Sequence, residues 1–107
     1  MSSNYRGEVF AFKEHIGDYK TWSIKPNYDG WIYLENNTTG LYLEGTENYL
    51  YAFSGRFKND DDSQKWRIIG SFIIHKLTGK VLDSDRQGLV YLSKFTAGPS
   101  QYLIKYF

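Results

Sequence analysis

Cysteine is absent from the 107-residue sequence, and its absence excludes several kinds of protein. Without thiols there is no disulfide framework, no thiolate metal site and no cysteine nucleophile. A surplus of one charge is also lacking, because 13 basic and 12 acidic residues are dispersed along the chain and leave a net charge of +1. Nucleic-acid phosphates require a one-sided basic face, so no nucleic-acid partner is expected.

Long apolar runs are missing as well. No stretch approaches the length that spans a bilayer, and no apolar run follows Met1 as it would in a signal peptide. We therefore expect no membrane insertion, and a location in the cytoplasm or outside the cell without a visible signal peptide. No segment combines a helical period with helix caps, so the chain is expected to be nearly all strand.

Short runs of β-branched and aromatic residues fill most of a chain that is 19% aromatic. Tyr and Trp suit half-buried sheet surfaces and binding faces. Bounded by Gly, Asn, Asp and Pro, these runs predict ten strands in one domain. The predicted strands are 8–13, 21–25, 31–35, 41–44, 49–54, 65–69, 72–76, 80–83, 89–94 and 102–107.

The sequence repeats itself with a period of about 40 residues. Gly40 and Leu43 recur 39 residues later as Gly79 and Leu82. A fixed period of this size marks a repeat architecture. We also match Tyr51 to Tyr91, and residues 6–12 to 87–93, so that the chain begins inside a further copy. The expected units are a partial copy one (1–29), copy two (30–69) and copy three (70–107).

A Gln-x-Trp motif lies near the end of each copy. Gln64-Lys65-Trp66 matches it fully, Gln101-Tyr102-Leu103 keeps the Gln, and Lys20-Thr21-Trp22 keeps the Trp. Gly40-Leu-Tyr-Leu-Glu44 and Gly79-Lys-Val-Leu-Asp83 share a hairpin signature. In order and spacing the chain resembles the ricin B-type β-trefoil lectins. The resemblance implies an all-β β-trefoil of three pseudo-repeats, the first truncated at its N-terminus, with Trp22, Trp66 and Leu103 in the core.

The resemblance also implies where a sugar would bind. In this family an acidic residue after the hairpin Leu accepts hydrogen bonds from hydroxyls, an aromatic of the third strand stacks on the ring, and a polar residue precedes the Gln. Copy two offers Glu44, Phe53, Ser63 and Gln64, and copy three offers Asp83, Ser100 and Gln101. The stacking position of copy three falls on Ser93, with Tyr91 and Phe95 close by, and that of copy one falls on Phe12, where the hairpin is lost.

These residues predict a lectin rather than an enzyme, with galactose-type sugars as the guess for the ligand. No catalytic residue, cofactor or metal site is assigned, and the acidic residues 60–62 are interpreted as a solvated loop. Two other classes stay open. Val90-Tyr-Leu-Ser93 is similar to the actin-binding trefoils fascin and hisactophilin, which suggests a protein-interaction trefoil, and a protease inhibitor or toxin is the remaining alternative.

The missing first strand of copy one should leave an unpaired sheet edge. Residues 102–107 could bend over the gap, with residues 2–5 on its other side. Alternatively, two chains could pair there and bury Tyr106 and Phe107. Because an aromatic terminus would otherwise be exposed, the sequence favours a homodimer through the truncated first repeat.

Overall fold

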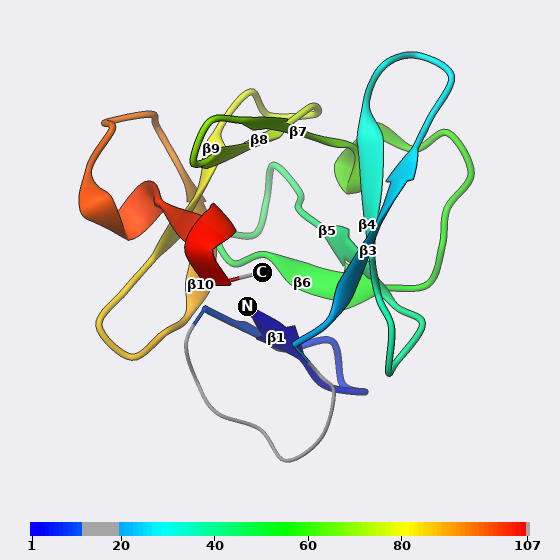
Figure 1. The fold of residues 1–107 in the computed structure, drawn as a ribbon, viewed down its shortest axis with the longest axis horizontal. Helices are drawn as coiled ribbons and strands as arrows, with labels where there is room; N and C mark the ends of the chain where they lie inside the picture. The colour runs from blue at the N-terminus through cyan, green and yellow to red at the C-terminus, as the bar shows by residue number, and fades with distance from the viewer. Residues whose placement is uncertain (12–19, 107) are drawn as a thin grey trace.

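A computed structural model describes residues 1–11 and 20–106, with side chains up to Ile104. The strands are β1 (Ser2–Ser3), β2 (Val9–Phe10), β3 (Trp22–Pro26), β4 (Ile32–Asn36), β5 (Tyr42–Glu44), β6 (Phe53–Gly55), β7 (Trp66–Ile69), β8 (Phe72–His75), β9 (Val81–Ser84) and β10 (Val90–Ser93). Three 3-10 helices accompany them, η1 (Asp62–Gln64), η2 (Pro99–Gln101) and η3 (Leu103–Tyr106). Figure 1 shows these elements around a common centre.

Nine of the ten predicted strands overlap an observed one, although residues 12 and 13 lie outside the described part of the chain. Copy two is complete, with β4, β5, β6 and β7 in order. Antiparallel pairs link the copies, because β3 pairs with β4 and β7 pairs with β8. Trp22 faces Asn36 in the first pair as Trp66 faces His75 in the second, so the junctions are equivalent.

The third strands of the three copies meet in a closed triangle. Three bridges join them, Glu8 with Phe53, Tyr51 with Tyr91, and Leu89 with Phe10. Three backbone hydrogen bonds follow the same rotation, from Ala11 N to Gly88 O (2.7 Å), Ser54 N to Gly7 O (2.8 Å) and Leu92 N to Leu50 O (3.0 Å). This three-fold arrangement makes the chain an all-β β-trefoil.

The triangle corrects the alignment of the third strands. Its symmetry makes Phe10, Phe53 and Tyr91 equivalent, so the predicted match of Tyr51 to Tyr91 is wrong by two residues. The aromatic of copy three is accordingly Tyr91 and not Ser93. In copy one the equivalent residue is Phe10, whereas the predicted Phe12 lies outside the described residues.

The core is formed by the residues that end each copy and those that close each hairpin. Trp66 has no exposed surface, and its indole N–H donates to Leu43 O at 2.9 Å. Trp22 is only half-buried, but its indole makes the same bond to Met1 O at 2.8 Å. Leu103 is fully buried in the third equivalent place. The predicted core positions are therefore confirmed for Trp66 and Leu103, and Trp22 packs against the same cluster.

Copy one keeps one strand of the hairpin that the sequence suggested was lost. β1 pairs with β2 so that Ser2 faces Phe10, which makes Ser2 the equivalent of Glu44 and Asp83. The second strand of the hairpin is thus present, and only the first strand is lacking. The predicted strand 102–107 is wrong, because residues 103–106 form η3, which packs on β8 and β9. A fourth strand there would have no first strand to pair with, so the chain coils and places Leu103 in the core.

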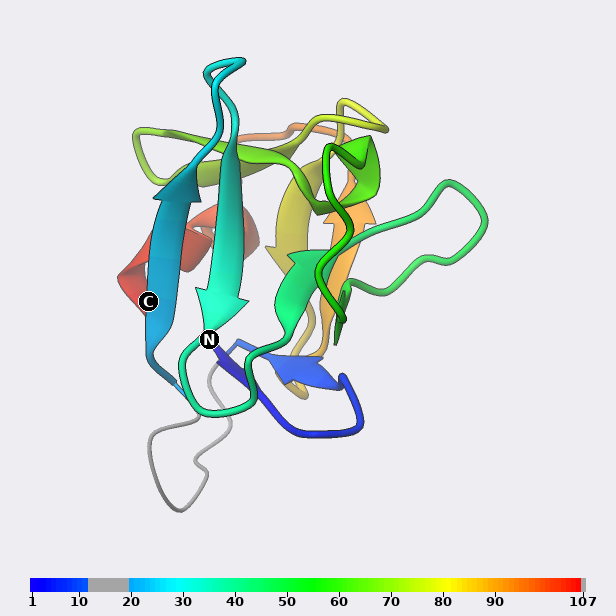
Figure 2. The same cartoon turned by 90° about the vertical axis from the view of Figure 1, so that its right-hand side faces the viewer.

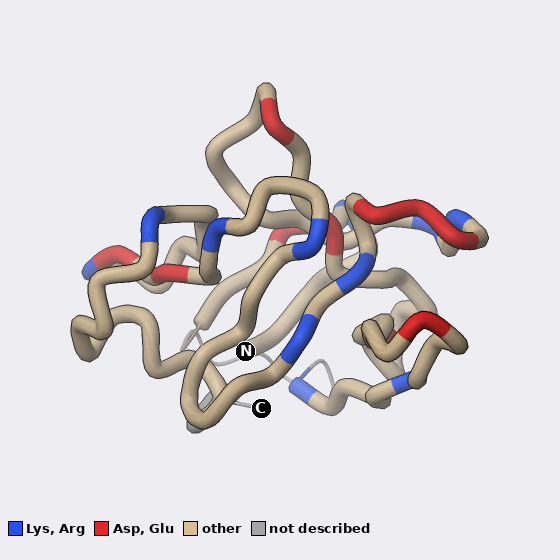
Figure 3. Tube along the Cα trace, turned by 90° about the horizontal axis from the view of Figure 1, so that it is seen from above, with Lys and Arg blue, Asp and Glu red and all other residues tan. Residues whose placement is uncertain are grey.

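Within the described residues η3 packs on β8 and β9, and the homodimer stays a prediction. The side chain of Tyr106 and the whole of Phe107 lie outside the description. Basic and acidic residues intersperse along the trace, apart from the acidic residues 60–62 (Figure 3). In the described part of the chain, no helix has the length and apolar character needed to cross a bilayer.

Candidate functional site

The two glutamines of the repeat motif have the same structural task in copies two and three. Gln64 accepts from Lys58 N (2.9 Å) and donates to Arg56 O (2.7 Å) and Glu44 Oε1 (3.1 Å). Gln101 accepts from Thr96 N (3.0 Å) and donates to Lys94 O (2.7 Å) and Asp83 Oδ2 (3.2 Å). Each buried amide therefore holds the preceding loop and directs one N–H to the hairpin acid, which satisfies its own polar groups.

The Glu44 carboxylate of copy two is bound by side chains of its own copy. Its side chain is 2% exposed, and the carboxylate pairs with Lys58 and accepts from Ser63 Oγ (3.3 Å) and Gln64. The hydrogen bond with Glu44 raises the pKa of Lys58. A Cβ atom on Gly55 would lie 2.8 Å from Glu44 Oε1, so glycine is what leaves room for the carboxylate. This acid has a neutralising cation and few lone pairs left for a ligand.

Asp83 in copy three has the same place but a different setting. It accepts from Ser84 N (2.8 Å) and Gln101, and it faces Tyr91 across the β9–β10 pair. Burial, followed by the nearby Asp83 carboxylate, raises the pKa of the Tyr91 hydroxyl. Thr96 stands where copy two has Lys58, and no ion pair to Asp83 is present among the described residues. Its charge is therefore not neutralised by a lysine.

The remaining predicted site residues divide between the two copies. Phe53 is half-buried opposite Glu44, and Ser63 is buried behind that carboxylate. Ser100 is exposed, and its carbonyl accepts from Ser84 Oγ at 2.9 Å, next to Asp83. The structure thus brings Asp83, Tyr91, Ser100 and Gln101 together in copy three. It likewise brings Glu44, Phe53, Ser63 and Gln64 together in copy two.

Copy one has no acidic residue at the position that Glu44 and Asp83 occupy in the other copies. Ser2 occupies the acid position, is buried, and its Oγ has no hydrogen-bond partner within the described residues. A hydroxyl that is short and enclosed cannot reach a ligand as a carboxylate would. The prediction that copy one has lost this hairpin is wrong for its second strand, because β1 pairs with β2 and places Ser2 at the acid position.

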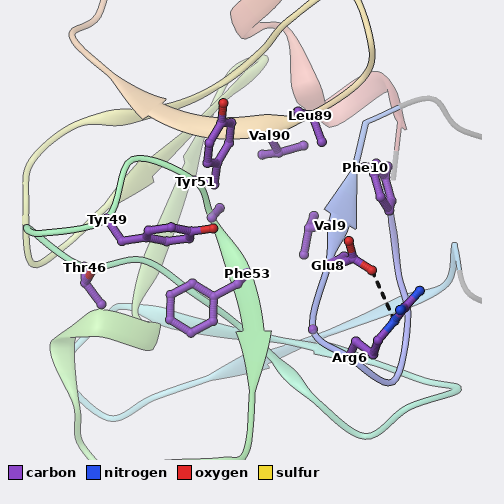
Figure 4. Close-up of a pocket in the computed structure, with 12 residues that line it drawn as sticks. Arg6, Glu8, Val9, Phe10, Thr46, Tyr49, Tyr51, Phe53, Leu89 and Val90 are labelled. Carbon is purple, nitrogen blue, oxygen red and sulfur yellow. Dashed lines mark ion pairs between the residues drawn. The ribbon is translucent and has the colours of Figure 1, made fainter.

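The sequence analysis missed a cleft of about 610 Å³ on the outer face of the triangle (Figure 4). The loop 45–52, which projects from the barrel in Figure 2, carries its aromatic wall. Its lining comes from all three copies and comprises Arg6, Gly7, Glu8, Val9, Phe10, Thr46, Tyr49, Tyr51, Ala52, Phe53, Leu89 and Val90. The available signal was the alternation Tyr49-x-Tyr51-x-Phe53, which places three aromatics on one face of an extended segment.

The acidic loop 60–62 surrounds a lysine. Lys65 is fully buried, and its Nζ lies 2.7 Å from Asp29 Oδ2 and also pairs with Asp60 and Asp62. The hydrogen bonds that Lys65 Nζ donates to Asp29 and Asp60 raise the pKa of Lys65. Across residues 1–11 and 20–106, no group of three or more His, Cys, Asp or Glu side chains is arranged to hold a metal ion. This cluster is an internal ion-pair network.

Comparison with known proteins supports the fold. No family model matches the chain, and no curated protein matches it. Among solved structures, the crystal structure of the designed 3-fold symmetric protein ThreeFoil is similar, with a TM-score of 0.70. The match covers 84% of this chain and 74% of that one, at 19% sequence identity. The structural similarity shows the β-trefoil fold alone, and the function has to be argued from the site.

Proposed function

We propose that the chain is a non-enzymatic carbohydrate-binding protein whose site lies in copy three. The observation that carries the proposal is the direct pairing of Asp83 with Tyr91 across β9 and β10, with Gln101 behind the carboxylate. Carboxylate oxygens accept hydrogen bonds from sugar hydroxyls, and an aromatic ring covers the apolar face of a pyranose. Ser100 is exposed, and its carbonyl accepts from Oγ of Ser84, the residue after Asp83.

The same chemistry is weaker in copy two. Glu44 already binds Lys58, Ser63 and Gln64, so a sugar hydroxyl would have to displace an internal partner. Breaking a charge-assisted hydrogen bond in a buried place costs about 1.5–3 kcal/mol. We therefore place the sugar site at Asp83 and give Glu44 a structural role.

A glycan array, followed by calorimetric titration with the best-bound glycan, tests the proposal. Asp83→Asn and Tyr91→Ala should each weaken binding at least tenfold. Asp61→Asn removes one acidic charge from an exposed loop and can still cap η1, so it serves as the control and should bind as the parent does. Absence of binding to every arrayed glycan, by a chain whose fold is verified by circular dichroism, would overturn the proposal.

A protein-interaction trefoil is the second candidate, because copy three also exposes an aromatic cluster. Phe95 is largely exposed and lies 4.8 Å from Phe72, ring centroid to centroid, and Tyr102 lies 5.4 Å from Phe72. Such a cluster suits an apolar contact with another protein. A failed glycan array combined with a partner whose binding is lost in Phe95→Ser would favour this candidate.

A further inference from the structure

The outer face of the strand triangle is one continuous surface. The central residues Val9, Ala52 and Val90 point inward and are buried. Successive strand side chains alternate between faces, so the residues on either side of these three point outward. The outward residues are Glu8, Phe10, Tyr51, Phe53, Leu89 and Tyr91, and five of the six line the 610 Å³ cleft.

The sixth residue, Tyr91, joins this cleft to the proposed sugar site. Tyr51 and Tyr91 are bridge partners, and the flanking bonds run from Ala52 N to Val90 O and from Leu92 N to Leu50 O, both 3.0 Å. This pattern defines a non-hydrogen-bonded pair, in which the two side chains lie closest. A ligand bound to Asp83 and Tyr91 therefore meets Tyr51 next, at the edge of the cleft.

One wall of the cleft, which begins at Tyr51, is aromatic. Tyr49 packs edge-on against both Tyr51 (5.9 Å between centroids) and Phe53 (6.1 Å). Tyr49 is 55% exposed and Tyr51 is 37% exposed, so their rings face solvent rather than the core. Figure 4 shows these rings on one side of the cleft and the strand segment with Glu8 and Arg6 on the other. The spacing gives a ring-shaped ligand an apolar wall.

The opposite rim is polar and carries no net charge. Arg6 Nε lies 3.4 Å from Glu8 Oε1, and both side chains are largely exposed. A carboxylate next to a guanidinium offers acceptors and donors side by side, which matches neighbouring hydroxyls of an uncharged polyol. A charged ligand would meet attraction from one member of the pair and repulsion from the other, so it gains no net electrostatic attraction here. The rim therefore favours a neutral ligand.

This rim is fixed before a ligand binds. Asn4 Oδ1 accepts from Arg6 N (3.0 Å) and Glu8 N (3.1 Å), and Asn4 Nδ2 donates to Glu8 Oε1 (3.0 Å). Gly7 has a φ of +83°, and a Cβ atom there would lie 2.4 Å from Ser54 O. Glycine thus allows the turn to lie directly against copy two. A preorganised rim reduces the entropy lost on binding.

We propose that the site takes a neutral oligosaccharide of at least two sugar units, with one unit at Asp83 and Tyr91 and the next in the cleft between Tyr49 and Glu8. This inference rests on the proposed carbohydrate function and adds the size and charge of the ligand. The cleft volume falls within the range of about 300–1,000 Å³ found for small-molecule sites. Tyr49, Tyr51, Glu8 and Arg6 are then the residues that determine chain-length specificity.

Calorimetric titrations with matched mono- and disaccharides test this proposal. The probes are galactose against lactose, glucose against maltose, and N-acetylglucosamine against N,N′-diacetylchitobiose. At least one disaccharide should bind tenfold or more tightly than its terminal sugar. Tyr49→Ala and Glu8→Gln should each remove that gain and leave monosaccharide binding unchanged. Tyr28→Ala, at the exposed tip of the β3–β4 hairpin, is the matched control and should change neither.

The outcomes separate this inference from the proposed function. If Asp83→Asn abolishes binding while Tyr49→Ala and Glu8→Gln leave the disaccharide gain intact, the extended cleft is wrong and the single-sugar site stands. If no disaccharide in the three pairs exceeds its monosaccharide, the cleft is likewise overturned. If binding survives in Asp83→Asn but is lost in Tyr49→Ala, the site in copy three is wrong and the cleft remains.

Discussion

Copies two and three place the same glutamine behind the same hairpin acid, yet the two acids do different work. In copy two Lys58 pairs with Glu44, whereas in copy three Thr96 occupies that loop position and no described lysine or arginine pairs with Asp83, although both acids are buried. One loop residue thus decides whether the hairpin acid has a lysine partner. A motif shared by two repeats therefore shows a common scaffold, and the partners of each acid show how its setting differs.

The largest effect on stability should come from Trp66, the buried tryptophan near the end of copy two. Trp66→Ala should lower the free energy of unfolding by about 3–5 kcal/mol, because it empties a fully buried aromatic site and removes the bond to Leu43 O. Leu103→Ala, at the equivalent place in copy three, should cost about 2–5 kcal/mol. Urea denaturation followed by tryptophan fluorescence and circular dichroism measures both. A Trp66→Ala protein as stable as the parent would show that the two copies do not share one core.

Substitution of Glu44 should lower stability, whereas substitution of Asp83 should weaken glycan binding. Glu44→Gln should cost about 1.5–3 kcal/mol, since it removes the buried charge that Lys58, Ser63 and Gln64 all contact. Glu44 is only 2% exposed, so this charge lies in the protein interior. Glycan affinity should be the same as in the parent. Thermal melts and calorimetry on Glu44→Gln and Asp83→Asn decide the matter, and equal loss of affinity in both would contradict the comparison.

The smallest effect concerns the pH dependence of stability. It comes from His75, which faces the core residue Trp66 at the junction of copies two and three. His75 stacks on Trp66 at 4.4 Å between centroids, and burial lowers the pKa of His75 below its ordinary value of 6.5. Only the unfolded chain then binds a proton just below pH 6.5, so stability is complete above that pH and falls as the pH drops. The slope is at most about 1.4 kcal/mol per pH unit.

Asn36 occupies the equivalent place in the β3–β4 pair, so His75→Asn is the natural control for this titration. The variant should show a shallower loss of stability between pH 7 and about pH 5 than the parent. Denaturation midpoints across this range measure the difference. Parallel pH profiles for the two proteins would mean that His75 titrates alike in the folded and unfolded chains.

The sequence predicted the repeats, the core residues and the residue sets of both acid sites, because these depend on period and motif. It could not place the third strands correctly, since a shift of two residues keeps every side chain on the same face and leaves the hydrophobic pattern unchanged. The sequence therefore assigned the stacking position of copy three to Ser93, and Tyr91 was predicted only to lie close to it. Strand propensity at 102–107 also misled, because η3 forms where no strand is available to pair. The cleft depends on three distant segments meeting, which no local pattern records.

The strand triangle has a consequence for how the chain reaches its native state. Each of its three hydrogen bonds joins residues far apart in sequence, with Ala11 bonded to Gly88, Ser54 to Gly7 and Leu92 to Leu50. No copy can complete its third strand until the other two have arrived. Although the sequence is repetitive, folding cannot spread from one unit to the next as it does in a solenoid. These long-range pairings instead imply a slow and cooperative transition that needs all three copies.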